Sequence, residues 1–246
     1  MKSGYPGAAL DPSLTMLEPF RALMELTFHQ FAGPQEAAAG DGHPVIIFPG
    51  LGSDGTSVSI LRARCQDLGY EASDWGQGFN IGPRGELAAW LEALADQISG
   101  QLAKHEKPAT LIGWSLGGLY ARELGKLLAP GLRQVITIAT PFNGGAHDSS
   151  AAWLSSVLGG GAASVDPSWI ERFRVPPPIR TTSIYSRTDG VVARETCRHD
   201  TCSGLVQDIE VDGSHMGMGW NQEVLRIIAD RLGPNAGPWL PGVDKT

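Results

Sequence analysis

The stretch Ile112-Gly113-Trp114-Ser115-Leu116-Gly117-Gly118 decides the fold. It joins a short apolar run that begins at Ala109 to a segment of helical length that begins at Leu116. A serine in the pattern G-x-S-x-G between a strand and a helix lies on a sharp turn that exposes its hydroxyl group. Gly113 and Gly117 lack side chains that would collide with the neighbouring strand and helix. The stretch therefore predicts a reactive serine at the carboxyl end of a strand.

Short apolar runs alternate with helix-length segments on both sides of this turn. Strands are predicted at Val45–Phe48, 70–74, Ala109–Gly113, Val135–Ala139, Thr181–Tyr185 and Leu205–Val211, and helices at 57–68, 86–104, Leu116–Leu128 and 220–232. This order predicts an α/β fold with a mainly parallel sheet and helices on both faces. Active sites of such sheets lie at the carboxyl ends of the strands. The polar residues that follow each strand are therefore the candidates for function.

Composition excludes several classes of protein. The chain has 246 residues, which fits one α/β domain. It carries 19 Lys and Arg against 26 Asp and Glu, a formal charge of −7, without a basic run to contact nucleic acid. No apolar stretch approaches the roughly 20 residues of a membrane span, and no signal peptide pattern is visible. Three cysteines cannot form a disulfide framework, so we expect a cytoplasmic protein.

Two segments lie outside the regular alternation. Residues 1–42 are predicted to form a helical leader packed on a core domain of residues 43–246. Within the leader, Pro19 should bend or restart the helix, and apolar residues recur at helical spacing and are expected to face the core: Leu14, Leu17, Phe20, Met24, Phe28 and Phe31. An inserted cap or lid is predicted at about 142–180, because two aromatic and apolar patches interrupt an unusually long connection. An ordinary insertion with its own small core would show the same pattern.

The serine needs a base, and three histidines follow it in the sequence. His215 lies in Gly213-Ser214-His215-Met216-Gly217, between the last strand and the last helix, from where a loop can return to Ser115. His147 lies at the start of the predicted cap, and His199 lies in a loop flanked by cysteines. We therefore predict His215 as the base that activates Ser115.

The acid that orients this base should lie between the serine and the histidine. Asp189 follows the predicted strand Thr181–Tyr185, so its carboxylate is expected at a strand's carboxyl end. An Asp-Gly pair is also common in solvated turns. Four other aspartates are less well placed, namely Asp166, Asp200, Asp208 and Asp212. We predict Asp189 as the acid.

The loop after the first strong strand is the second part of the expected site. Phe48-Pro49-Gly50-Leu51-Gly52-Ser53 can bring a backbone N–H opposite the serine. An oxyanion requires two donors, and those predicted are the amides of Leu116 and Leu51. Gly52 and Ser53 are alternatives for the second donor.

These segments resemble those of bacterial serine hydrolases of the α/β-hydrolase superfamily, lipase and esterase type. The resemblance rests on the serine stretch, on Ser186-Arg187-Thr188-Asp189-Gly190-Val191-Val192 and on the His215 segment, and it covers about residues 43–232. It implies a nucleophile at Ser115, an acid at Asp189 and a base at His215, with oxyanion amides at Leu51 and Leu116. The His-Gly pair usual in the oxyanion loop is replaced here by Pro49-Gly50.

Other candidate sites are weaker. Cys197, His199 and Cys202 lack a clear fourth ligand for zinc, so a loop disulfide or free thiols are expected, and Cys65 is expected in the core. No metal or other cofactor is predicted. The predicted substrate pocket comprises Trp114, Trp153 and Leu154, although for Trp114 packing against the face of the sheet is the favoured interpretation.

The sequence therefore predicts an esterase or lipase that acts on small hydrophobic esters through an acyl-enzyme. An acyltransferase or a thioesterase would use the same three residues. A ligand-binding homologue that has lost catalysis is the alternative from another class. A dehalogenase is disfavoured because the turn carries serine in place of a carboxylate.

Overall fold

A computed structural model describes residues 10–33, 38–144, 166–202 and 204–233. The central feature is one sheet of six strands, all parallel, in the order β2-β1-β3-β4-β5-β6. The strands are β1 Pro44–Phe48, β2 Glu71–Asp74, β3 Ala109–Trp114, β4 Leu132–Ile138, β5 Arg180–Ser186 and β6 Val206–Val211. The predicted parallel sheet is thus confirmed, and the six predicted strands lie within a few residues of those observed.

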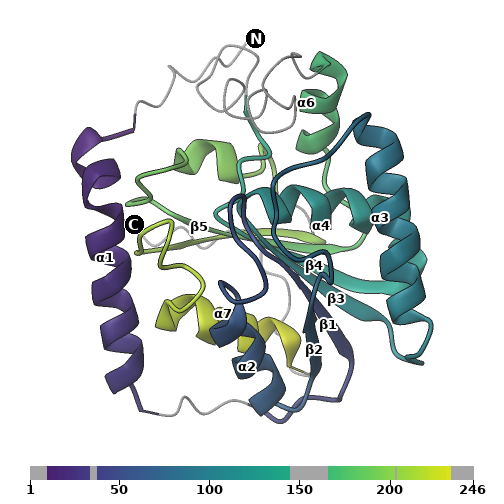
Figure 1. The fold of residues 1–246 in the computed structure, drawn as a ribbon, viewed down its shortest axis with the longest axis horizontal. Coiled ribbons are helices and arrows are strands. Elements are labelled where there is room, and N and C mark those ends of the chain that lie inside the picture. Colours follow the sequence, from purple (N-terminus) through teal and green to yellow (C-terminus); the bar gives the residue numbers. More distant parts are fainter. Residues whose placement is uncertain (1–9, 34–37, 145–165, 203, 234–246) are drawn as a thin grey trace.

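Helices cover both faces of the sheet (Figure 1). The helices are α1 Pro12–Phe31, α2 Ser59–Asp67, α3 Leu87–Leu102, α4 Leu116–Leu127, α6 Pro167–Arg174 and α7 Gln222–Leu232, with short 3-10 turns at Ala129–Gly131 and Arg194–Cys197. One buried apolar cluster joins the sheet to α2 and α7, and the other joins it to α3, α4 and α6. None of the helices in these ranges is long and apolar enough to cross a bilayer.

The central strands β1 and β3 are nearly continuous apolar runs. Every residue of β1 and of β3 is buried, as expected for strands that helices cover on both faces. The loops after β1, β3, β5 and β6 emerge at the same edge of the sheet because the strands are parallel. This edge collects the residues that the sequence predicted as functional.

Helix α1 is continuous through Pro19, so the helix does not restart there as predicted. The prediction that the apolar face of this helix packs on the core is also wrong, because most of its residues are exposed. The exposed fractions are 48% for Leu17, 61% for Phe20, 41% for Met24, 66% for Phe28 and 84% for Phe31. The buried residues of α1 are Glu18 and Ala22. The helix therefore turns a polar face inward, where its side chains hydrogen-bond to loops of the core.

The predicted cap is described only at its ends. Trp153 and Leu154 of the predicted pocket, and His147, lie outside the described residues. Helix α6 follows at Pro167–Arg174, and its Phe173 joins the core beside α4. Arg122 of α4 is fully buried and donates to the backbone carbonyl of Phe173 at 3.0 Å, which joins α6 to α4.

Candidate active site

Ser115 lies on the turn between β3 and α4 with a backbone φ of 53°, a value that non-glycine residues seldom adopt. The glycines around it permit very close packing. A Cβ atom on Gly113 would lie 2.4 Å from backbone atoms of Gly117 and Gly118, and one on Gly117 would lie 2.4 Å from the carbonyl oxygen of Phe48. The G-x-S-x-G pattern thus reflects the crossing of α4 over the ends of two strands.

The structure brings Ser115, His215 and Asp189 together. The Ser115 hydroxyl lies 3.1 Å from Nε2 of His215, and Nδ1 of His215 lies 2.7 Å from Oδ2 of Asp189. All three residues are buried, with exposures of 6%, 7% and 5% in the order serine, histidine and acid. The hydrogen bond to the carboxylate assigns the proton to Nδ1, which leaves Nε2 free to accept the proton of Ser115.

Backbone amides fix the carboxylate of Asp189. Its Oδ1 accepts hydrogen bonds of 2.8 Å from the N–H groups of Val191 and Val192, which leaves Oδ2 for His215. Ser186 ties the loop of the acid to the loop of the histidine, because its hydroxyl donates to the Gly213 carbonyl at 2.7 Å. Hydrogen bonds to the backbone therefore hold the carboxylate of Asp189 and join its loop to the loop of His215.

Burial tends to lower the pKa of His215, but neighbouring carboxylates outweigh it. The charge and hydrogen bond of Asp189, and the charge of Glu18, raise the pKa of His215 above its ordinary value of 6.5. The imidazolium form is thus favoured more than in water, which suits a group that must take up a proton during a reaction.

The other candidate acids and bases are engaged elsewhere. His199 pairs through Nδ1 with Asp208 at 2.7 Å and lies 2.8 Å from Arg122 through Nε2. Burial lowers the pKa of His199 despite its carboxylate partner. Asp166 caps α6, Asp200 accepts from Asn143, and Asp212 pairs with Arg187. Within the described residues, none of these side chains is hydrogen-bonded to Ser115 or to the imidazole of His215.

The loop after β1 lies against the serine turn. A Cβ atom on Gly50 would lie 3.4 Å from that of Ser115. The N–H of Gly52 donates to the carbonyl of Asn80 at 2.8 Å, so it is not available to an oxyanion. In the described part of the chain, the backbone N–H groups of Leu51 and Leu116 have no such partner.

An apolar rim beside this loop was missed by sequence reasoning. Asn80 anchors the segment 79–81 through its side chain, which donates to the Pro49 carbonyl at 2.9 Å. The exposed apolar side chains of this rim are Phe79, Ile81, Leu51 and, from the histidine loop, Met216. The sequence offered no periodic signal here, because the rim combines three separate loops.

Trp114 lies behind the serine turn. It is 8% exposed and belongs to the core cluster that contains α2 and α7. The distance between ring centroids is 6.4 Å from Trp114 to His215 and also 6.4 Å from Trp114 to Trp220. Its contacts are those of a packed core residue next to the imidazole. Of the predicted pocket residues it alone falls within the described ranges.

No cluster of side chains suited to hold a metal ion occurs among the described residues. The three cysteines are free thiols, with Cys65 and Cys197 buried. Burial raises the pKa of Cys197 well above its usual range, so this thiol is unreactive. Cys197 and Cys202 were expected to form either a loop disulfide or free thiols, and in the structure they are free thiols.

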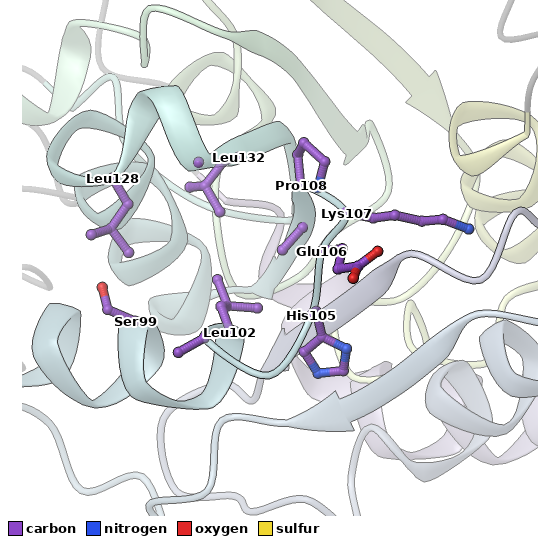
Figure 2. A pocket seen from close by; sticks show the side chains of 11 residues that line it. Ser99, Leu102, His105, Glu106, Lys107, Pro108, Leu128 and Leu132 are labelled. Carbon is purple, nitrogen blue, oxygen red and sulfur yellow. The ribbon is translucent and has the colours of Figure 1, made fainter.

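A separate pocket of about 360 Å³ opens at the opposite edge of the sheet (Figure 2). Ala109 and Leu132, at the amino ends of β3 and β4, line it together with residues from the end of α3, including Ser99. Because Ser115 lies at the carboxyl end of β3, this pocket is remote from the candidate site.

A family model described as "Alpha/beta hydrolase family" matches residues 26–236. No curated protein sequence matches the chain. Several solved structures have a similar fold. A monoacylglycerol lipase of Paleococcus ferrophilus is 15% identical with a TM-score of 0.52, over 80% of this chain and 95% of that one. A pyrethroid hydrolase of Sphingobium faniae JZ-2 is 15% identical with a TM-score of 0.52, over 79% and 98%. The thioesterase domain from the curacin biosynthetic pathway is 11% identical with a TM-score of 0.51, over 79% and 92%.

Proposed function

Because the chain belongs to the alpha/beta hydrolase family, we propose that it is a serine hydrolase that cleaves carboxylic esters through an acyl-enzyme. The observation that carries the proposal is the continuous hydrogen-bonded line from the Ser115 hydroxyl through His215 to Asp189, with distances of 3.1 Å and 2.7 Å. A hydroxyl activated by an oriented imidazole is the arrangement that acyl transfer requires.

The reaction begins when Ser115 attacks the ester carbonyl carbon. Nε2 of His215 takes the hydroxyl proton as the new C–O bond forms, and Asp189 stabilises the imidazolium through Nδ1–H. The negative charge on the carbonyl oxygen is stabilised by the N–H groups of Leu51 and Leu116, the latter at the positive end of α4. The imidazolium then protonates the alcohol as it leaves.

Deacylation repeats these steps with water. His215 removes a proton from water, the hydroxide attacks the acyl carbon, and the Ser115 oxygen leaves with the proton from His215. The base works only when it is neutral. Since neighbouring carboxylates raise the pKa of His215, turnover should fall with acidification at a pH above 6.5.

The apolar rim supports a hydrophobic acyl or alcohol group in the substrate. Phe79 is 58% exposed and Ile81 is 53% exposed beside the loop that carries Leu51. Large apolar side chains that face solvent near a polar reaction centre favour apolar ligands, because burying them releases water.

The test is a panel of p-nitrophenyl esters of increasing acyl length, with the corresponding thioesters and amides. Ser115→Ala should lose ester turnover and covalent labelling by a serine-directed phosphonate, and mass spectrometry should locate the phosphonate on Ser115. Ser99→Ala, an exposed serine at the remote pocket, is the matched control and should behave as wild type. Turnover that survives in Ser115→Ala contradicts the proposal.

Two outcomes separate the neighbouring functions. Preferred thioester turnover would assign a thioesterase, and transfer to an added alcohol in place of water would assign an acyltransferase. A protein that neither turns over nor reacts with the phosphonate would be a ligand-binding homologue.

A further inference from the structure

A carboxylate of the N-terminal helix lies between the loops of the acid and the base. Glu18 of α1 is 2% exposed. Its Oε1 accepts hydrogen bonds from the N–H groups of Gly190, at 2.8 Å, and His215, at 3.0 Å. Its Oε2 accepts from the N–H of Met216 at 3.1 Å. One oxygen atom thus joins the residue that follows Asp189 to the backbone of the histidine itself.

Two further polar residues of α1 hold the same loops. Arg21 donates to the carbonyl of Thr188 at 2.6 Å, and Oε1 of Glu25 accepts from the N–H of Ser214 at 2.7 Å. Residues 18, 21 and 25 lie on one face of the helix because they are spaced by three and four positions. The inward face of α1 is therefore matched to the backbone of the catalytic loops.

A buried carboxylate is costly unless its oxygens are satisfied. Glu18 meets this condition with three amide donors and with Arg21, whose NH1 lies 3.5 Å from Oε1. A chain that needed only to attach this helix could do so with its apolar residues, yet those face outward. This arrangement indicates that the two loops require the Glu18 carboxylate as an acceptor for their backbone N–H groups.

We propose that Glu18 is a positioning residue that holds the loops of Asp189 and His215 in register and places a second negative charge beside the imidazole. The inference rests on the proposed role of His215 as the base. Glu18 lies before residue 26, where the match to the family begins, so the family resemblance does not assign it this role.

The physical effect has two parts. Glu18 contacts loops that are 172 and 197 residues away in the sequence, so the distance between Asp189 and His215 depends on it. Its charge also adds to that of Asp189 in raising the pKa of His215 against the effect of burial. The charged groups around the histidine loop are Asp189, the α1 residues Glu18, Arg21 and Glu25, and the exposed pair Arg187–Asp212.

The experiment measures the His215 pKa directly, by NMR titration of protein labelled with ¹³C-histidine. The His215 signal is assigned by its absence in His215→Gln. In Glu18→Gln the pKa of His215 should fall by about half a unit or more, because a nearby negative charge is lost in a poorly solvated site. The acid limb of kcat/KM should move to lower pH by the same amount, and kcat should fall about tenfold as the loops lose register.

Two companion variants separate charge from position. Glu18→Asp keeps the charge on a shorter side chain, so the pKa of His215 should stay near the wild-type value while kcat falls. Leu23→Ala, on the exposed face of the same helix, should change neither quantity. A lower melting temperature in Glu18→Gln with an unmoved His215 titration would reduce Glu18 to a structural attachment and overturn the proposal.

The titration also distinguishes this inference from the proposed function. If the wild-type protein turns over no ester, the proposed function fails, yet the His215 titration still reports whether Glu18 acts on the imidazole. If ester turnover is strong and Glu18→Gln matches wild type in pKa and kcat, only the role of Glu18 is overturned.

Discussion

Replacing Ser115 with glycine is expected to give a more stable protein than replacing it with alanine. Both variants lack the hydroxyl, so they differ in the Cβ atom at a residue with φ of 53° and ψ of −120°. Strain at such a residue costs about 1–3 kcal/mol, and glycine relieves it. Against this, an alanine-to-glycine change loses about 1 kcal/mol through the greater freedom of the unfolded chain. The expected net gain for Ser115→Gly over Ser115→Ala is about 1 kcal/mol.

The measurement is the free energy of unfolding from urea denaturation, supported by the melting temperature. A gain of about 1 kcal/mol corresponds to about 2–4 °C for a chain of this size. Ala109→Gly is the matched control, because Ala109 is 1% exposed in β3 without a positive φ. That change should destabilise the protein by about 1–2 kcal/mol through lost methyl burial and chain entropy.

The refuting result is that Ser115→Gly is less stable than Ser115→Ala by as much as Ala109→Gly is less stable than wild type. That result would mean that the turn holds its serine without strain. The expected result would mean that the chain gives up stability to present a hydroxyl group, which is a familiar relation between stability and function at active sites.

Three further results are expected. Gly113→Ala should abolish activity and destabilise the protein by about 3 kcal/mol or more in urea denaturation, because its Cβ would lie 2.4 Å from the backbone of Gly118; a stable, active variant would contradict the packing. Phe79→Ala should lower kcat/KM for long-chain esters by about tenfold and leave acetyl ester turnover nearly unchanged, measured over the ester panel; an equal loss for both would place Phe79 outside the acyl site. Burial raises the pKa of Glu25 above 4.5, so this residue's contribution to stability is present below pH 4.5 and is lost as the pH rises through the raised pKa. Urea denaturation should therefore show wild type losing stability relative to Glu25→Gln between pH 4.5 and 7, and a parallel pH dependence of the two would refute this.

The geometry of the candidate site could be predicted because its signals are local or ordered along the chain. The turn at Ser115 is set by glycines two residues away on either side, and the structure has the strand and helix that this pattern predicts. Asp189 and His215 were chosen by their places after strands, which parallel pairing converts into proximity. The second oxyanion donor is a different case, because the engagement of Gly52 by Asn80 depends on a loop for which the sequence has no pattern.

Helix α1 shows where this kind of reasoning stops. Its apolar periodicity correctly predicts a helix, since a 3.6-residue repeat is a property of the segment alone. The choice of the buried face is a competition between burying apolar side chains and satisfying polar groups elsewhere in the fold. The loops after β5 and β6 present backbone N–H groups that need acceptors, and Glu18 and Glu25 supply them across more than 170 residues. An apolar face packed there would leave four N–H donors unsatisfied, those of Gly190, Ser214, His215 and Met216, at about 1–3 kcal/mol each. This cost competes with the gain of roughly 1.5–3 kcal/mol from fully burying one large apolar side chain. The polar inward face of α1 therefore follows from the hydrogen-bonding needs of the loops that carry Asp189 and His215.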